Sequence, residues 1–172
     1  VEIEKEEDNI DAIEQSAYHV KPEVKGPFLR YLIKSQDMKQ VLVFVSSTRT
    51  ADNLYEKLRK NGIKAASLHG KLTQGARVDA LKAFKDGKVK VLIATDLLSR
   101  GIHIEQLPVV INYELPRSPL DYVHRIGRTG RANETGKAIS LITDEEMHHF
   151  KIIQKKMKKQ VELHGTTGID LH

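Results

Sequence analysis

Residues 40–45 of the chain read Gln-Val-Leu-Val-Phe-Val, and residues 90–94 read Lys-Val-Leu-Ile-Ala. Short, continuous apolar runs of this kind are typical of strands buried on both faces, as in parallel sheets. Around these runs the hydrophobic period alternates, which predicts further strands at 15–20, 65–68, 109–113 and 137–142 and helices at 27–35, 50–61, 73–86, 119–126 and 145–159. The alternation predicts an α/β fold with a mostly parallel central sheet and helices on both faces.

Local signals mark where several of these helices begin and end. Thr73, Ser118 and Asp144 are residues that commonly cap helix N-termini, and Gly62 and Gly87 are expected to end two of the helices. Beyond about residue 161 no period is evident, so the tail is predicted to be a loop or the start of a truncated element.

Length and charge bound the possible functions. The 172 residues suit one domain, and 28 Lys plus Arg against 23 Asp plus Glu leave a net charge of +5. Residues 1–14 hold seven acids and one lysine, so that segment carries −6 and the remainder +11. The acidic start is predicted to be a solvated linker or arm. The basic remainder suits a polyanionic partner such as nucleic acid, or a soluble basic protein without one.

Two absences restrict the class of protein further. Without cysteines there is no disulfide and no thiolate zinc site, which fits a reducing cytoplasm. No run approaches the roughly 20 apolar residues of a membrane-spanning helix. We therefore expect a cytoplasmic protein with no membrane partner.

The most basic string is residues 124–131, His-Arg-Ile-Gly-Arg-Thr-Gly-Arg. Glycine beside arginine lets the backbone approach a ligand closely and leaves the guanidinium free to project. Arg128 and Arg131 are three residues apart, so at the end of a helix they would point roughly the same way. Two converging guanidiniums match the charge of a phosphoryl group in transfer. A single Arg-Gly pair would indicate only a solvated basic turn, whereas the whole string indicates a phosphoryl site.

Two further candidate segments follow predicted strands, where ligands bind in sheets of this class. In the first, Thr95 ends a buried strand, and its hydroxyl and the next N–H can hold a phosphate. An ordinary strand exit is the alternative there. In the second, Gly70 precedes a helix whose first turn presents Gln74 and Arg77 on one face. Together with the helix N-terminus they make a weak anion site.

Taken in this order, the strings resemble the C-terminal RecA-like domain of DEAD-box ATP-dependent RNA helicases. Residues 41–48 look like motif IV of that family, 94–101 like motif V and 124–131 like motif VI, which is the most specific of the three. The resemblance implies a three-layer RecA-like domain over residues 13–160, between the acidic arm 1–12 and the tail 161–172. It also implies an N-terminal RecA-like domain of the same protein, closing with this one over ATP and RNA.

The resemblance further implies residue roles. Arg128 and Arg131 would be the catalytic arginine fingers, in an ATP site that also includes Gly101 and His103. His124 and Arg125 would couple this domain to the catalytic acid motif of the other. The residues that would hold phosphates of one RNA strand are Ser46, Arg49, Gly70, Arg77 and Thr95. Backbone contacts of this kind predict little sequence preference.

The chain departs from the family pattern at His103, where the family has an Asp that hydrogen-bonds the ATP ribose. Imidazole can also bond a hydroxyl, but it lacks the fixed negative charge and its protonation varies near neutral pH. A weaker, pH-dependent ATP affinity and a tolerated substitution both stay open.

Two signatures of a complete helicase are missing from the sequence: a P-loop, Gly-x-x-x-x-Gly-Lys-[Ser/Thr], and an Asp-Glu-Ala-Asp string that would hold magnesium. We therefore expect half of an enzyme, inactive alone, with ATP and Mg²⁺ bound mainly by the N-terminal domain. No metal site is predicted in this chain, since the adjacent His148 and His149 would point apart on their helix. The lysines of residues 151–159 are expected to form a solvated helix face rather than an RNA contact.

Two other functions stay open at the level of sequence. A related helicase domain acting on DNA would be distinguished by stimulation of the full-length ATPase with DNA rather than RNA. A noncatalytic RNA-binding scaffold would show no RNA-stimulated ATPase. The RNA target and the oligomeric state are not predicted.

Overall fold

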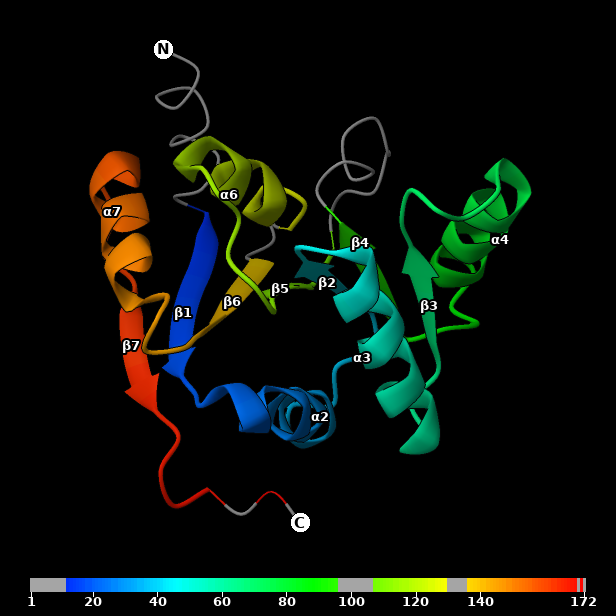
Figure 1. Cartoon of the computed structure of the whole chain (residues 1–172), viewed down its shortest axis with the longest axis horizontal. Helices are drawn as coiled ribbons and strands as arrows, with labels where there is room; N and C mark the ends of the chain where they lie inside the picture. The colour runs from blue at the N-terminus through cyan, green and yellow to red at the C-terminus, as the bar shows by residue number, and fades with distance from the viewer. Residues whose placement is uncertain (1–11, 96–106, 130–135, 170, 172) are drawn as a thin grey trace.

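The computed structural model describes residues 12–95, 107–129, 136–169 and 171 (Figure 1). Within these residues the elements follow the predicted order, with strands and helices alternating except between β4 and β5, where no helix is described. They are β1 (Ile13–His19), the 3-10 turn η1 (Pro22–Val24), α2 (Lys25–Ser35), β2 (Val41–Val45), α3 (Thr48–Lys60), β3 (Ala65–Leu68), α4 (Gln74–Lys85), β4 (Val91–Thr95), β5 (Val109–Asn112), α6 (Pro119–Ile126), β6 (Gly136–Ile142), α7 (Met147–Met157) and β7 (Glu162–Gly165).

The seven strands form one sheet in the order β3-β4-β2-β5-β6-β1-β7, and every pairing among the described residues is parallel. This confirms the α/β prediction. The register aligns one row of residues across the sheet: Leu68, Ala94, Phe44, Asn112, Ser140 and Ala17. Because the strands are parallel and in register, their carboxyl ends meet at one edge.

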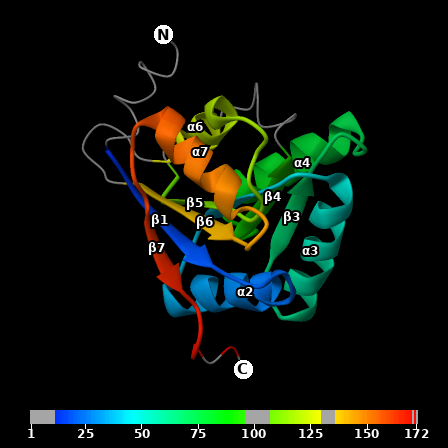
Figure 2. The same ribbon diagram turned by 60° about the vertical axis from the view of Figure 1, so that its left-hand side comes forward.

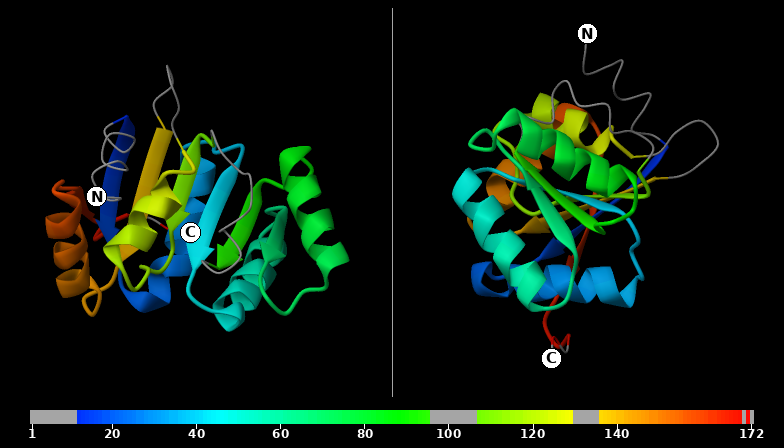
Figure 3. Two further views of the ribbon diagram at one scale, coloured as in Figure 1. Left: turned by 90° about the horizontal axis from the view of Figure 1, so that it is seen from above. Right: turned by 90° about the vertical axis from the view of Figure 1, so that its right-hand side faces the viewer.

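Each face of the sheet buries its own set of side chains. Val41, Val43 and Val45 of β2 pack with the apolar residues of α2 and α3, whereas Leu42 and Phe44 point to the opposite face and pack with Phe84 of α4. On that second face α6 and α7 cover β1 and β6. Figure 2 and Figure 3 show the sheet between these two helical layers. Each fully buried Val, Leu or Phe contributes about 1.5–3 kcal/mol of hydrophobic free energy.

The chain changes direction across the sheet between β2 and β5, which are neighbours. From β2 the chain proceeds through α3 to β3 at one edge, whereas from β5 it proceeds through α6 to β6 in the other direction, on the opposite face. A crevice opens outside the carboxyl ends of strands at such a switch point. The β2–β5 boundary is therefore the expected ligand site of this sheet.

Two local predictions were correct. Thr73 caps α4 by accepting a hydrogen bond from the N–H of Ala76, and Ser118 caps α6 by accepting one from Asp121 N–H.

One cap prediction was wrong. Asp144 does not cap α7: its carboxylate pairs with His19 at 2.5 Å, and the cap position is Glu146. The tail, predicted to be a loop or the start of a truncated element, contains the strand β7, which pairs with β1 from Ser16 to His19. No local pattern revealed β7, because three of its four residues are exposed and it is held by the edge of β1. None of the described helices has the length and apolar character needed to cross a membrane.

Candidate nucleotide and nucleic-acid interface

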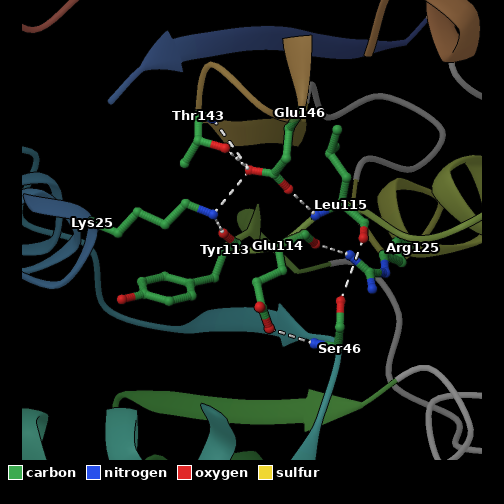
Figure 4. A network of polar contacts seen from close by, with 8 residues as sticks. All are labelled: Lys25, Ser46, Tyr113, Glu114, Leu115, Arg125, Thr143 and Glu146. Atoms are coloured by element: carbon green, nitrogen blue, oxygen red, sulfur yellow. Dashed lines mark hydrogen bonds and ion pairs between the residues drawn. The ribbon is translucent and has the colours of Figure 1, made fainter. Parts of the chain in front are cut away.

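The switch point is closed by a contact between Ser46, which follows β2, and Glu114, which follows β5. The N–H of Ser46 donates to Glu114 Oε1 at 2.7 Å, and its hydroxyl is 3.4 Å from the carbonyl oxygen of Leu115 (Figure 4). The Glu114 carboxylate thus accepts the hydrogen bond of the Ser46 N–H. The hydroxyl contact to Leu115 is long, so a ligand oxygen can replace the Leu115 carbonyl as its acceptor. Ser46 is an exposed residue, so its hydroxyl can reach a ligand at this edge of the sheet by giving up the long, part-buried contact to Leu115.

Lys25 and Glu146 hold the loop between β5 and α6 from two sides. Lys25 Nζ donates to the carbonyl oxygen of Tyr113 at 2.6 Å and to Glu146 Oε1 at 3.1 Å. The other oxygen of Glu146 accepts the N–H of Leu115 at 3.1 Å, and Oε1 also accepts the N–H and hydroxyl of Thr143. All these donors converge on one carboxylate in Figure 4. They fix the loop that leads from the switch point into α6.

The same contacts set the charge state of Glu146. Burial is the largest single influence and raises the pKa of its carboxyl. Lys25, together with the Leu115 and Thr143 donors, outweighs burial, so the pKa of Glu146 lies below its ordinary value. Glu146 is therefore ionised at neutral pH and paired with the almost fully buried Lys25.

Arg125 is buried inside the domain, with an exposed fraction of 1%. Its Nη1 donates to Asn112 Oδ1 at 3.1 Å and to the carbonyl oxygen of Glu114 at 2.5 Å, and its guanidinium lies over the Phe44 ring. Side chains of a helix lean toward its N-terminus, which here begins at the carboxyl edge of the sheet. Arg125 therefore reaches back from α6 to hold the end of β5.

A polar chain continues from this contact into the core. Asn112 Nδ2 donates to Ser140 Oγ at 3.1 Å, and the Tyr122 hydroxyl lies 3.3 Å from the same oxygen and 3.2 Å from Gln15 Oε1. Burial raises the pKa of Tyr122 to about 12, so its hydroxyl stays protonated and able to donate. These bonds tie β5, β6, β1 and α6 together.

The turn after α6 lies at the other end of β5. Gly127 caps the helix, and a Cβ there would come within 3.2 Å of the Val123 carbonyl oxygen. The carbonyl oxygen of Arg128 then accepts the N–H of Leu107 at 3.1 Å, and the Thr129 hydroxyl donates to the Leu107 carbonyl oxygen. Leu107 stands two residues before β5. The backbone of Arg128 is thus anchored at the amino end of that strand, with its side chain partly exposed.

The remaining RNA candidates lie along the carboxyl edge. In the parallel register Thr95 of β4 pairs with Val45 of β2, and Ser46 is the next residue after Val45. Gly70 follows β3, and Arg77 Nη2 donates to its carbonyl oxygen at 2.9 Å, while Arg77 Nε is buried without a partner among the described residues. Arg49 is exposed in the first turn of α3. Ser46, Gly70, Arg77 and Thr95 therefore share one edge of the sheet.

His69, beside Gly70, has a structural contact of its own. It receives the Lys71 N–H on Nδ1 at 3.3 Å and is bonded through Nε2 to Asp52 at 3.0 Å. Its side chain is 5% exposed, so it positions the turn that carries Gly70 rather than facing a ligand.

The candidate residues are thus divided between two places. The RNA candidates gather at the carboxyl edge, whereas Arg128 follows the end of α6 at the amino end of β5, with His124 one helical turn before it. Arg131, Gly101 and His103 lie outside the described residues. Sequence reasoning assigned no role to Lys25, Glu114 or Glu146, because each contacts a residue more than 30 positions away and none belongs to a local motif.

Similarity to known proteins agrees with this geometry. The helicase conserved C-terminal domain family matches residues 24–133. The chain is 41% identical over 159 residues to the probable ATP-dependent RNA helicase ddx49 of Dictyostelium discoideum, covering 92% of this chain and 31% of that protein. It is 38% identical over 161 residues to the ATP-dependent RNA helicase RhlB of Pseudomonas syringae, covering 94% and 41%. It thus spans about a third of the length of these relatives.

Solved structures show the same relationship. A DEAD box protein from the hyperthermophile Methanococcus jannaschii superposes with a TM-score of 0.84 and 41% identity, over 90% of this chain and 42% of that one. The C-terminal domain of the DEAD-box protein Dbp5 superposes with a TM-score of 0.82 and 35% identity, over 91% of both chains. The chain therefore belongs to the helicase conserved C-terminal domain family and corresponds to the C-terminal RecA-like domain of DEAD-box proteins.

Proposed function

We propose that this chain is the C-terminal half of an ATP-dependent RNA helicase, binding the backbone of single-stranded RNA and completing the ATPase site when it closes on an N-terminal RecA-like domain. The relatives named as ATP-dependent RNA helicases support the reaction class. The observation that carries the RNA part is the shared carboxyl edge of Ser46, Gly70 and Thr95.

RNA contact at this edge would be made by small groups. The Ser46 and Thr95 hydroxyls and the exposed backbone of Gly70 are suited to phosphate oxygens, and Arg77 and Arg49 add positive charge. Lys25, Glu146 and Arg125 position the β5–α6 loop beside them. Contacts to the 2′-hydroxyls would distinguish RNA from DNA.

The ATP-binding part rests on Arg128, Arg131, Gly101 and His103. Bound ATP with Mg²⁺ supplies the phosphoryl group that is transferred, and positively charged guanidiniums suit its γ-phosphate. Arg128 fits this role as a partly exposed side chain on an anchored backbone. No three His, Cys, Asp or Glu side chains of the described ranges gather as metal ligands would. Because the sequence holds neither a P-loop nor an Asp-Glu-Ala-Asp string, we assign ATP and Mg²⁺ mainly to the N-terminal domain and expect this chain to be inactive alone.

The coupling role of His124 and Arg125 needs one refinement. Arg125 holds Glu114 and Asn112 within its own domain, so we propose that it acts by positioning the loop at the interdomain face. His124, one residue earlier and partly exposed, is the better candidate for a direct contact with the other domain.

The test joins this chain to its natural N-terminal half and measures ATP turnover with and without RNA. Arg128→Ala is expected to lower turnover by about 10³-fold or more while RNA affinity is retained. Arg117→Ala, an exposed arginine just before α6, is the matched control and should leave turnover unchanged. If ATP turnover neither increases with RNA nor falls in Arg128→Ala, the helicase function is not supported and an RNA-binding scaffold is favoured.

A separate measurement addresses His103. Nucleotide affinity of the joined protein, followed from pH 6 to pH 8, should become pH-independent and tighter in His103→Asp. An affinity that does not change would show that the substitution is tolerated.

A further inference from the structure

The edge of the sheet opposite the RNA candidates is built from three similar turns. There α2, α3 and α4 end and lead into β2, β3 and β4, near the lower end of β3 in Figure 1. Each turn contains one residue with left-handed φ, Asp37 at 48° and Gly62 and Gly87 at 77°. The residue after each donates to the carbonyl oxygen five positions earlier, closing the same helix cap three times.

Five lysines from these turns line one open groove of about 780 Å³. We call it the amino-edge lysine groove; its lysines are Lys34, Lys39, Lys64, Lys88 and Lys90. Lys64 and Lys90 directly precede β3 and β4, and the N–H of Lys90 donates to the Lys64 carbonyl oxygen at 2.9 Å. Adjacent strands lie about 4.8 Å apart, so these two lysines start side by side. The sheet order, not the sequence, brings the lysines together.

The positive charge of the groove exceeds what the protein itself neutralises. Asp37 bonds Lys39 at 2.9 Å, and Lys39 first, with a smaller effect of Lys90, lowers the pKa of that carboxyl. Each of the three helix C-termini adds about −0.5 charge. Together with Asp37 and with Asp86, which caps α4 in the third turn, these offset about 3.5 of the five lysine charges, so a net positive charge remains. Within the described residues Lys34, Lys64, Lys88 and Lys90 form no ion pair.

The lining favours a peptide over a nucleic acid as the occupant. No aromatic side chain and no arginine is among the described residues that line the groove, so bases have nothing to stack on. Ile33 and Ile63 line it beside the lysines, and a Cβ at Gly62 or Gly87 would meet nothing within 4 Å, so the turns leave room for a chain. We propose that the amino-edge lysine groove binds an acidic peptide segment of a partner protein.

This site does not depend on the proposed helicase function. The RNA candidates lie at the carboxyl edge of the same strands, so peptide and RNA can occupy the domain together.

The test is fluorescence anisotropy of a labelled ten-residue peptide of eight Glu and two Leu, titrated with the full chain. Lys64→Glu with Lys90→Glu is expected to weaken binding at least about ten-fold, with strong salt dependence. Lys151→Glu with Lys155→Glu changes the net charge equally on α7 and should weaken binding less than about two-fold. Lys64→Gln with Lys90→Gln is the milder pair should the glutamates disturb folding, which thermal melting would detect.

Several results would overturn the proposal. If the Lys64/Lys90 and Lys151/Lys155 double variants weaken peptide binding equally, the binding reflects net charge only. If the unmodified chain does not bind the peptide, the proposal is wrong. Oligouridine that displaces the peptide, and loses affinity in the Lys64 and Lys90 variants, would make the groove an RNA surface. Peptide binding at least ten-fold tighter after deletion of residues 1–11 would make the occupant the chain's own acidic arm.

Discussion

Lys25 and Glu146 lie 121 residues apart in the chain and form an ion pair of 3.1 Å. Lys25 belongs to α2 on one face of the sheet, and Glu146 precedes α7 on the other. Both also bond the backbone of the β5–α6 loop, at Tyr113 and Leu115. Both helical layers therefore bind the same β5–α6 loop. This loop leads into α6 and the basic string 124–131 at its end.

Replacing Glu146 by Gln should destabilise the chain in a pH-dependent way. At pH 7 we expect a loss of about 2–3 kcal/mol in the free energy of unfolding, because the buried Lys25 loses its partner. The pKa of Glu146 is lowered in the folded state, so its contribution is present above the unfolded value and is lost as pH falls through the folded pKa. Urea unfolding from pH 7 to pH 3 should show the two proteins converging below about pH 4.5.

Glu145→Gln is the control for this comparison, since the neighbouring Glu145 is exposed. It should change stability by less than about 0.5 kcal/mol. A constant difference between Glu146→Gln and the unmodified chain at all pH values would contradict the role of the ionised carboxylate.

Arg125→Lys should lower the stability of the isolated chain by about 2–4 kcal/mol. An ammonium group cannot reach Asn112 and Glu114 while also lying flat over Phe44. Thermal melting of the chain alone measures the effect, and Arg117→Lys provides the exposed comparison. An unchanged melting temperature would mean that Arg125 acts only on the other domain.

Ser46, which we propose to contact RNA, is adjacent to Ser47, which caps α3, so substituting each serine in turn tests the two roles separately. In the joined two-domain protein Ser46→Ala should reduce RNA affinity about three- to ten-fold, the value of one hydrogen bond, without affecting melting. Ser47 caps α3 by accepting the N–H of Thr50 at 3.1 Å, so Ser47→Ala should cost about 1 kcal/mol of stability. Filter binding measures the RNA affinity of both variants, and thermal melting measures their stability. Loss of RNA affinity in Ser47→Ala, or loss of stability in Ser46→Ala, would contradict this assignment.

Ending the chain after Gln160 should destabilise it by about 2–3 kcal/mol. The deletion removes the buried Val161 and the β7 pairing with β1. Hydrogen exchange should quicken at residues 16–19 as their edge opens. A chain ending after Gly165 retains both features and serves as the control; equal stability of the two truncations would show that β7 contributes nothing.

Much of the fold could be predicted because its signals are local. The apolar runs at 41–45 and 91–94 identify buried strands, and Thr73 and Ser118 identify helix starts, since a cap depends only on the next few residues. The prediction that Asp144 caps α7 was wrong because its carboxylate instead bonds His19, a residue far away in the chain. β7 gave no signal because its exposed residues follow no period and its pairing partner is some 146 residues earlier.

By itself the sequence determined the order of strands and helices from β1 to α7 and the basic string at 124–131, because period, capping and motif spacing are properties of neighbouring residues. Only the tertiary structure decided that Arg125 is buried against Glu114, that Lys25 pairs with Glu146, and that Lys64 and Lys90 stand side by side. These contacts follow from the strand order and register, which are set by packing across the whole sheet and leave no mark in a short stretch of chain.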